Sequence, residues 1–322
     1  MAERNLVQAL NQALFLAFEK DPHVVVLGED VGVDGGVFRV TDGLLAKFGE
    51  KRVIDTSIGE STIVGSALGM AINGLKPIAE IQFSGFIYPA FQQLISHVSR
   101  MRNRTRGVFG VPIVIRSPNG GGVNALEHHS ESLEAVYAHI PGLKVVMPSN
   151  PYDGKGLLLA AINDPDPVLL LEPIKLYRAF KQEVPDAYYE VPIGLAQIVQ
   201  AGKDITILAW GAMVLVAQDA ASQVQASCEI IDLRTIMPWD KKTILESAKK
   251  TGRVVIIHEA IHTCGFGAEL AATIQEECLD YLQAPIVRVT APDVIVPYYR
   301  SEHFYRPNAD MLIEKIKQTL TY

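Results

Sequence analysis

Hydrophobic residues in the first half of the chain form two alternating kinds of segment. One kind is a short, continuous apolar run, and the other is a longer stretch with apolar residues three or four positions apart. Continuous apolar runs are typical of parallel strands that helices cover on both faces. The predicted strands are His23–Gly28, Arg52–Asp55, Pro77–Ile81, Pro112–Arg116, Lys144–Met147 and Val168–Leu171. The predicted helices are Leu6–Phe18, Ser61–Asn73, Pro89–Thr105 and Pro151–Asn163.

A change of pattern divides the chain in two. Lys175–Pro192 is rich in charge and tyrosine, carries two prolines and has neither the strand nor the helix period, which indicates an interdomain connection. Strand–helix alternation then resumes with Ile205–Trp210, Met213–Gln225, Glu229–Asp232, Lys241–Lys250, Arg253–His258, Gly267–Leu282 and Pro285–Val289. We therefore expect two α/β domains, residues 1–178 and 195–322, joined by a linker over 179–194. Each domain should hold a mostly parallel sheet flanked by helices.

Composition narrows the class of protein. The 322 residues include 29 basic and 36 acidic side chains, a formal charge of −7, and 48% are hydrophobic, which is typical of a globular core. A mildly acidic chain without a basic block argues against nucleic acid or anionic membrane as its main partner. The longest uncharged apolar stretch, Ile205–Ala217, is shorter than the ~18 residues of a spanning helix. No secretory signal is visible, and three cysteines without CxxC spacing favour a reduced, cytoplasmic protein.

One motif literally matches a zinc-peptidase signature. His258–His262 reads HEAIH, and in such peptidases a helix places both histidines on one face with the glutamate beside the metal-bound water. Here the pentapeptide directly follows Arg253–Ile257, a predicted strand, which would separate the two imidazoles. We interpret the motif as a strand end, with a zinc peptidase as the alternative.

Two polar segments follow predicted strands of the first domain. The segment Asp55–Ser61 places an acid at the carboxyl end of a strand, where open α/β sheets bind ligands. A structural alternative for Glu60 is the first turn of a helix, where the helix dipole favours an acid. The polar loop from Ser117 to Ser130 carries two histidines, which could act as acid, base or donor near neutral pH or lie exposed without a role.

Many ordered motifs together resemble one family, the beta subunits of thiamine-diphosphate-dependent 2-oxo acid dehydrogenases, which have a transketolase-like fold. The motifs extend over essentially the whole chain. They are Gly28–Gly32, Asp55–Glu60, Glu80–Phe86, Ser117–Gly120, His129–Ser132, Pro141–Val146, Leu171–Arg178, Asp232–Thr235 and Ala291–Asp293. The resemblance implies oxidative decarboxylation of a 2-oxo acid and transfer of the acyl group to a lipoyl group of an acyltransferase core. Bacterial subunits that act on pyruvate are most similar, with branched-chain 2-oxo acid and acetoin dehydrogenases as alternatives.

The resemblance also implies site residues. Glu60 matches the glutamate that shares a proton with the aminopyrimidine ring of thiamine diphosphate, and His129 matches the active-site histidine, whereas its neighbour His128 does not. Ile58, Gln82 and Phe86 match residues that line the pyrimidine site. A structural potassium ion is implied at the main-chain carbonyls of Ile113, Ala161, Ile162, Asp164 and Asp166. This chain departs from the family with Ser57 for a frequent proline and Asp166 for a frequent asparagine.

A missing motif indicates a partner. Self-sufficient thiamine enzymes hold magnesium and diphosphate with a GDG motif followed by an asparagine, and no GDG occurs here. The resemblance implies that an alpha subunit supplies this half of the site, in an assembly of two alpha and two beta subunits. A non-catalytic binding subunit is a further alternative, against which the pairing of Glu60 and His129 argues.

Overall fold

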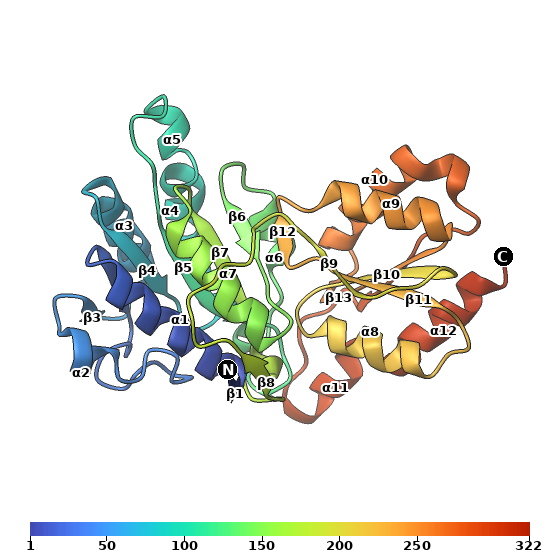
Figure 1. Ribbon diagram of the computed structural model, residues 1–322, viewed down its shortest axis with the longest axis horizontal. Helices are drawn as coiled ribbons and strands as arrows, with labels where there is room; N and C mark the ends of the chain where they lie inside the picture. The colour runs from blue at the N-terminus through green and yellow to red at the C-terminus, as the bar shows by residue number, and fades with distance from the viewer.

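A computed structural model describes residues 1–322, and most of its strands belong to two sheets (Figure 1). The first sheet has the order β12-β6-β7-β5-β4-β2-β3, and all its pairs are parallel except β12 with β6. Its strands are β2 (Val24–Gly28), β3 (Val53–Asp55), β4 (Lys76–Glu80), β5 (Val114–Asn119), β6 (Lys144–Val146), β7 (Val168–Pro173) and β12 (Thr235–Met237).

The second sheet has five strands in the order β14-β13-β10-β11-β9, and only β9 is antiparallel to its neighbour. Its strands are β9 (Gln197–Gln200), β10 (Ile205–Ala209), β11 (Cys228–Asp232), β13 (Val254–Ile261) and β14 (Val287–Ala291). A separate antiparallel pair, β1 (Ala2–Arg4) and β8 (Gln182–Val184), joins the start of the chain to the predicted linker. The expectation of two mostly parallel sheets flanked by helices is therefore confirmed.

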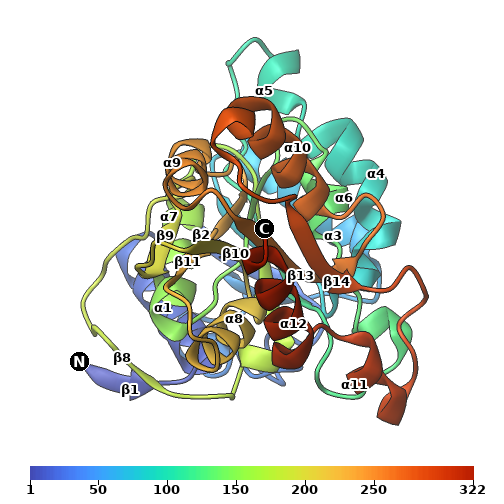
Figure 2. The ribbon, with the colours of Figure 1, turned by 90° about the vertical axis from the view of Figure 1, so that its right-hand side faces the viewer.

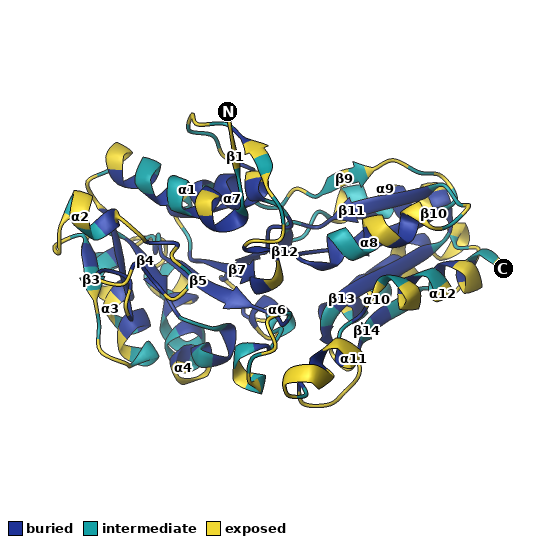
Figure 3. Cartoon of the chain, turned by 90° about the horizontal axis from the view of Figure 1, so that it is seen from below, coloured by how far each residue is buried: buried dark blue, intermediate teal, exposed yellow.

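Helices cover both faces of each sheet. In the first, α1 and α7 lie on one face and α3 and α4 on the other (Figure 3). In the second, α8 and α12 lie on one face and α9 and α10 on the other (Figure 2). The helices are α1 (Leu6–Lys20), α2 (Leu44–Phe48), α3 (Glu60–Ile72), α4 (Phe91–Gln93), α5 (Met101–Arg104), α6 (Glu134–Ala138), α7 (Pro151–Asn163), α8 (Met213–Ser222), α9 (Lys241–Thr251), α10 (Phe266–Cys278), α11 (Glu302–Tyr305) and α12 (Ala309–Leu320). None of them is long and apolar enough to cross a membrane.

The continuous apolar runs are explained by two hydrophobic cores, one on each side of the sheets. Successive strand residues point to opposite faces, so Val24 and Val26 of β2 enter one core and Leu27 enters the other. The second sheet follows the same rule, with Ile207 in the first core and Leu208 in the second. Because both faces are covered, nearly every strand position must be apolar.

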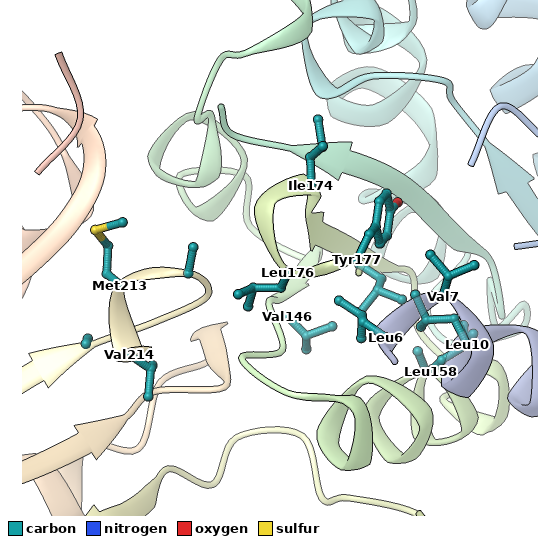
Figure 4. Packing of buried hydrophobic residues seen from close by; sticks show 14 of the residues in the cluster. Leu6, Val7, Leu10, Val146, Leu158, Ile174, Leu176, Tyr177, Met213 and Val214 are labelled. Atoms are coloured by element: carbon teal, nitrogen blue, oxygen red, sulfur yellow. The ribbon is translucent and has the colours of Figure 1, made fainter. Parts of the chain in front are cut away.

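Each core extends across the domain boundary. In the first core, Leu6 and Leu10 of α1 and Leu158 of α7 belong to the same buried cluster as Met213 and Val214 of α8 (Figure 4). Residues of both sheets therefore share one packed interior on each side. This continuity fixes the second domain against the loops of the first, which carry the candidate site.

Several elements differ from the sequence-based expectation. The predicted helix Pro89–Thr105 is instead a 3₁₀ turn η1 (Ser84–Ala90), α4, a π turn η2 (Leu94–Val98) and α5. Ser99 and Thr105 each donate a hydroxyl hydrogen bond to the carbonyl four residues earlier, a pattern that often bends helices. The elements that were not predicted are β1, β8, β9, β12, α2, α6, α11 and α12. Strand β12 comes from the second domain yet pairs with β6 of the first sheet.

Candidate active site

The carboxyl edge of the first sheet brings several of the predicted residues together. Strands β2, β3 and β4 are parallel neighbours, so the segments that follow them leave the sheet at the same edge. Glu29 follows β2, and its carboxylate accepts a hydrogen bond from the amide of Gly59, 3.3 Å away, just before Glu60. Gln82 follows β4 and donates to Asp30 at 3.1 Å. Residues from three separate loops therefore border one site.

Glu60 is the first residue of α3 and is half-buried. The positive end of the helix dipole favours a carboxylate in this first turn. Burial raises the pKa of the nearby Glu29 above its ordinary value, and the hydrogen bond from the Gly59 amide opposes this rise. The negative charge of Glu60 raises the pKa of Glu29 further. Asp55 has a structural role, since its carboxylate accepts from the amides of Gly32 and Val33 at 2.5 and 3.0 Å.

His129 lies among aromatic rings that come from another part of the chain. Its imidazole centroid is 4.4 Å from the ring of Phe83 and 5.1 Å from that of Phe86, both at near edge-to-face angles. Its Nδ1 is buried and has no hydrogen-bond partner. In contrast, His128 is exposed and lies 3.6 Å from Glu131. The two adjacent histidines therefore have different surroundings, and only His129 faces the aromatic pair.

Unpartnered polar atoms concentrate in the segment that carries this histidine. Twelve buried side-chain polar atoms lack a hydrogen-bond partner, and six of them belong to the segment 127–134. These six residues are Glu127, His129, Ser130, Glu131, Ser132 and Glu134. Buried polar groups are nearly always paired in native proteins, so such a cluster marks a place where a ligand or water completes the bonding. The segment is therefore suited to bind a polar group from outside the chain.

The other predicted residues have different settings. The side chain of Ile58 is 86% exposed in the turn before Glu60, so this chain alone leaves a large apolar group uncovered at the site. Phe86 packs on Phe83 at 5.4 Å between centroids. No hydrogen bond or ion pair joins Glu60 to His129, so any joint action of the two needs a molecule between them.

The residues predicted to hold potassium lie at the opposite edge of the sheet. Ile113 precedes β5, Asp164 and Asp166 precede β7, and Ala161 and Ile162 lie in the last turn of α7. The carbonyl of Ile113 already accepts from the Val168 amide at 2.9 Å, and that of Ala161 from the Asp164 amide at 3.2 Å. A carbonyl oxygen has a second lone pair for a cation, and the helix C-terminus favours positive charge.

Basic side chains already contact this loop. Lys144 Nζ lies 2.6 Å from a carboxylate oxygen of Asp164, and Arg102 is paired with Asp166. These ion pairs use side-chain oxygens and leave the main-chain carbonyls available. At the amino edge of the sheet, a bound ion would stabilise structure and would not touch the candidate active site.

The HExxH motif lies on strand β13 and the loop that follows it, as the sequence predicted. His258 is fully buried and stacks on Trp210, with ring centroids 5.2 Å apart. Burial lowers the pKa of His258 to about 3, with smaller effects from Arg288 and His262. His262 is exposed, and its Nε2 lies 2.7 Å from a guanidinium nitrogen of Arg288. A cation beside one imidazole and an aromatic ring stacked on the other do not form a zinc site.

Sequence reasoning missed a buried charge network beneath the site. Arg116 on β5 binds Glu172 on β7 through two hydrogen bonds of 2.8 and 2.6 Å and also pairs with Glu80 on β4. The hydroxyl of Tyr177 donates to Glu172 at 2.6 Å. The two carboxylates raise the pKa of Arg116, although burial opposes them. Glu80 ends β4 just before Gln82, so this network fixes the edge from which the site is built.

Comparison with protein families agrees with this architecture. The family model for the transketolase pyrimidine-binding domain matches residues 2–179, and the model for the transketolase C-terminal domain matches residues 194–312. Among solved structures, the chain is similar to one described as a split gene transketolase, an inactive beta4 tetramer. That likeness has a TM-score of 0.78 at 22% identity and covers 99% of both chains, which shows a shared fold.

Similar sequences extend over the full length. The chain is 56% identical to the pyruvate dehydrogenase E1 component subunit beta of Acholeplasma laidlawii over 321 residues, 99% of this chain and 98% of the relative. It is 50% identical to the subunit of the same name in Mycoplasma pneumoniae, covering 99% and 98%. The corresponding Staphylococcus aureus subunit is 46% identical, and the match covers 100% of both chains.

Proposed function

The chain belongs to the family of pyruvate dehydrogenase E1 component beta subunits, a thiamine-diphosphate-dependent enzyme family. From this we propose the reaction that the protein catalyses and the role of each site residue in it. With an alpha subunit, it would decarboxylate pyruvate and transfer the acetyl group to a lipoyl group of the acyltransferase core. The names of the relatives support pyruvate over a branched-chain 2-oxo acid or acetoin as the substrate.

The observation that carries the proposal is the position of Glu60. It is half-buried at the first turn of α3, on the carboxyl edge of a parallel sheet, and Glu29 supports the turn before it. Thiamine diphosphate, when bound, supplies a carbon centre that attacks the 2-oxo acid and stabilises the electron pair that remains when carbon dioxide leaves. Glu60 would hold a proton at the pyrimidine ring and so set the protonation state that the cofactor needs.

Three further residues fit the pyrimidine site. Phe86 offers an aromatic face, Ile58 offers an uncovered apolar side chain, and Gln82 offers an amide near Asp30. The unpartnered polar atoms in the segment 127–134 fit a polar cofactor and substrate beside His129. His129 would stabilise negative charge on the bound intermediate's oxygen and donate a proton as the lipoyl ring opens.

The remaining half of the cofactor site belongs to the partner in this proposal. The chain has no GDG motif, so magnesium and the diphosphate would be held mainly by the alpha subunit, in an assembly of two alpha and two beta subunits. The exposed Ile58 supports a site that another chain covers. The same proposal places a potassium ion at the carbonyls near Ile113 and Asp164. It also includes domain limits of 1–178 and 195–322 and a cytoplasmic location.

Replacement of Glu60 tests this assignment. Glu60→Gln keeps the size of the side chain and removes its ability to share a proton. In the assembly reconstituted with the alpha subunit, decarboxylation should fall by roughly 10²–10⁴-fold, the usual scale of acid–base catalysis. The matched control is Glu50→Gln, which changes an exposed glutamate outside the site and should keep the parent rate. Near-parent turnover of Glu60→Gln would refute the role of this residue.

A further inference from the structure

The loop that carries His129 is bound at its start by two glutamates of the second domain. We call residues 119–133 the His129 loop. The amide of Gly121 donates to Glu259 Oε1 at 2.6 Å. Glu302 accepts from two more amides of the loop, those of Gly122 and of Asn124, the latter at 2.8 Å. Glu259 is the second residue of the HExxH motif, and the proposed function gives this motif no role.

An arginine makes this pair of carboxylates stable. Arg306 Nε lies 3.1 Å from Glu259 Oε1 and 4.0 Å from Glu302 Oε1, and Nη2 lies 3.4 Å from the other oxygen of Glu259. The side chains of Glu259 and Arg306 are each 13% exposed and that of Glu302 only 2%. Two carboxylates this deeply buried would repel each other without the guanidinium between them. Their hydrogen bonds to amides are charge-assisted and therefore strong.

The glycines of the loop are required for this contact. A Cβ at Gly121 would collide with Glu302 Oε1, and a Cβ at Gly122 would lie 2.5 Å from the side chain of Lys175. Gly122 also has a φ of +106°, which side chains rarely adopt. The glycine run Gly120–Gly122 thus lets the carboxylates reach the backbone. Glycine at 121 is explained by contact with Glu302 of the second domain, and glycine at 122 by contact with Lys175 of the first domain and Arg306 of the second.

The other end of the loop is held by the first domain. The Gly120 amide donates to the Glu131 carbonyl at 2.9 Å, and the Ser84 hydroxyl donates to the same carbonyl at 3.0 Å. The His129 amide donates to the carbonyl of Leu126 at 3.0 Å. The loop is therefore closed at its base, and its outer part, from Gly121 to Asn124, is bonded to the second domain.

We propose that Glu259 and Glu302, held together by Arg306, are positioning residues that fix the His129 loop so that the imidazole stays against Phe83 and Phe86. The three residues act through the backbone and do not touch the reacting atoms. The catalytic consequence rests on the role proposed above for His129, whereas the physical contact does not. The second domain thereby contributes to a site whose predicted residues all lie in the first.

Hydrogen exchange in the assembly reconstituted with the alpha subunit tests the contact directly. Glu259→Gln and Glu302→Gln keep the side-chain size but remove the charge from the hydrogen bonds. The amides of Gly121, Gly122 and Asn124 should exchange about tenfold faster, the scale of one weakened charge-assisted bond. The control Glu276→Gln changes an exposed glutamate of α10 and should leave these amides unchanged. Unchanged exchange in both loop-contacting variants would overturn the proposal.

Separate assays test what the contact does. If it positions His129, Glu302→Gln should reduce acetylation of a lipoyl domain by about tenfold and reduce decarboxylation, followed with an artificial electron acceptor, much less. Adding His129→Ala to Glu302→Gln should then cost no more than His129→Ala alone. Fully additive losses would refute positioning. If Glu302→Gln prevents folding, Glu259→Asp serves instead, because it keeps the charge but withdraws it from Gly121.

The two proposals can fail separately. Faster exchange of the loop, combined with full acetylation activity in His129→Ala, would refute the proposed role of His129 and with it the catalytic purpose of the contact. Unchanged exchange, combined with the expected loss in His129→Ala, would refute the contact and leave the proposed function intact.

Discussion

A buried carboxyl at the domain boundary should make the stability of this protein depend on pH. Glu134 on α6 is 1% exposed, and its Oε1 accepts a hydrogen bond from the indole nitrogen of Trp210 in the second domain at 3.1 Å. Its other oxygen has no partner. Burial raises the pKa of Glu134 from 4.5 to about 7, the Trp210 bond opposes the rise, and the charge of Glu259 adds to it.

The direction of the effect follows from proton binding. The unfolded chain releases the proton of Glu134 near its ordinary pKa, whereas the folded protein keeps it until about pH 7. Between these values the folded state binds more protons, so the free energy of unfolding falls as pH rises and levels off above about 7. The shift corresponds to about 3 kcal/mol. In a chain of this size that equals a change of about 4 °C in the unfolding midpoint.

Glu134→Gln should remove this dependence. The amide oxygen still accepts from Trp210, and the residue no longer titrates. We therefore expect the variant to match the parent near pH 4.5 and to unfold at a temperature about 4 °C higher at pH 8. Calorimetry of the reconstituted assembly at one fixed protein concentration measures the midpoints.

Asp232 needs its own control, because burial raises its pKa to about 7 as well and the Ser149 hydroxyl opposes the rise. Part of the pH dependence should therefore survive in Glu134→Gln and disappear only when Asp232→Asn is added. Exposed Glu276→Gln is the neutral control. Parallel midpoint curves for the parent and Glu134→Gln between pH 4.5 and 8 would show that Glu134 is ionised in the folded protein and that the reasoning is wrong.

Three further predictions concern the first domain. Arg116→Met leaves Glu80 and Glu172 buried without their partner and should lower stability by about 3–5 kcal/mol. Adding both Glu80→Gln and Glu172→Gln should restore most of the unfolding midpoint, and no loss in the single variant would contradict the network. His129→Ala should lose lipoyl acetylation far more than decarboxylation, while His128→Ala should change both activities little. Equal losses in the two variants, measured in paired assays, would mean that only the loop's shape matters. Purified alone, the chain should bind thiamine diphosphate more weakly than about 1 μM, and tighter binding in calorimetry would refute the divided site.

The fold was predictable where the periodic pattern is long enough to read. Every strand predicted from an apolar run is present, because burial on both faces requires apolar residues at nearly every position. Strand β12 has three residues and pairs with β6, about 90 residues earlier in the chain. Strands β3 and β6 are equally short, but β12 begins only three residues after β11 ends, and its partner is set by the packing of two domains. Local sequence could not indicate it.

The sheet edge that carries the candidate site was predictable by a similar rule. The carboxyl edge of a parallel sheet is set by strand direction alone, so the segment after β3 could be assigned to that edge from its sequence. The distance of His129 from Phe83 and Phe86 is different, because it depends on how a long loop folds back. Only the family resemblance selected His129 over His128. Their contrasting surroundings, one against aromatic rings and one exposed, give that choice a physical meaning.

The HExxH motif shows why spacing needs a secondary structure before it has a chemical meaning. On a helix, residues four apart share a face, and the two histidines would meet at one metal. On β13, neighbouring side chains point to opposite sides, so His258 turns inward to Trp210 while Glu259 turns toward the amide of Gly121, 138 residues away in sequence. His258 and His262, four residues apart, would lie on the same side of an extended strand but about 13 Å from each other, too far to share one metal. The carboxylate of Glu259 is free for a backbone contact. The sequence could indicate the strand, but it held no signal for the partner, since a glycine amide is the same at every glycine.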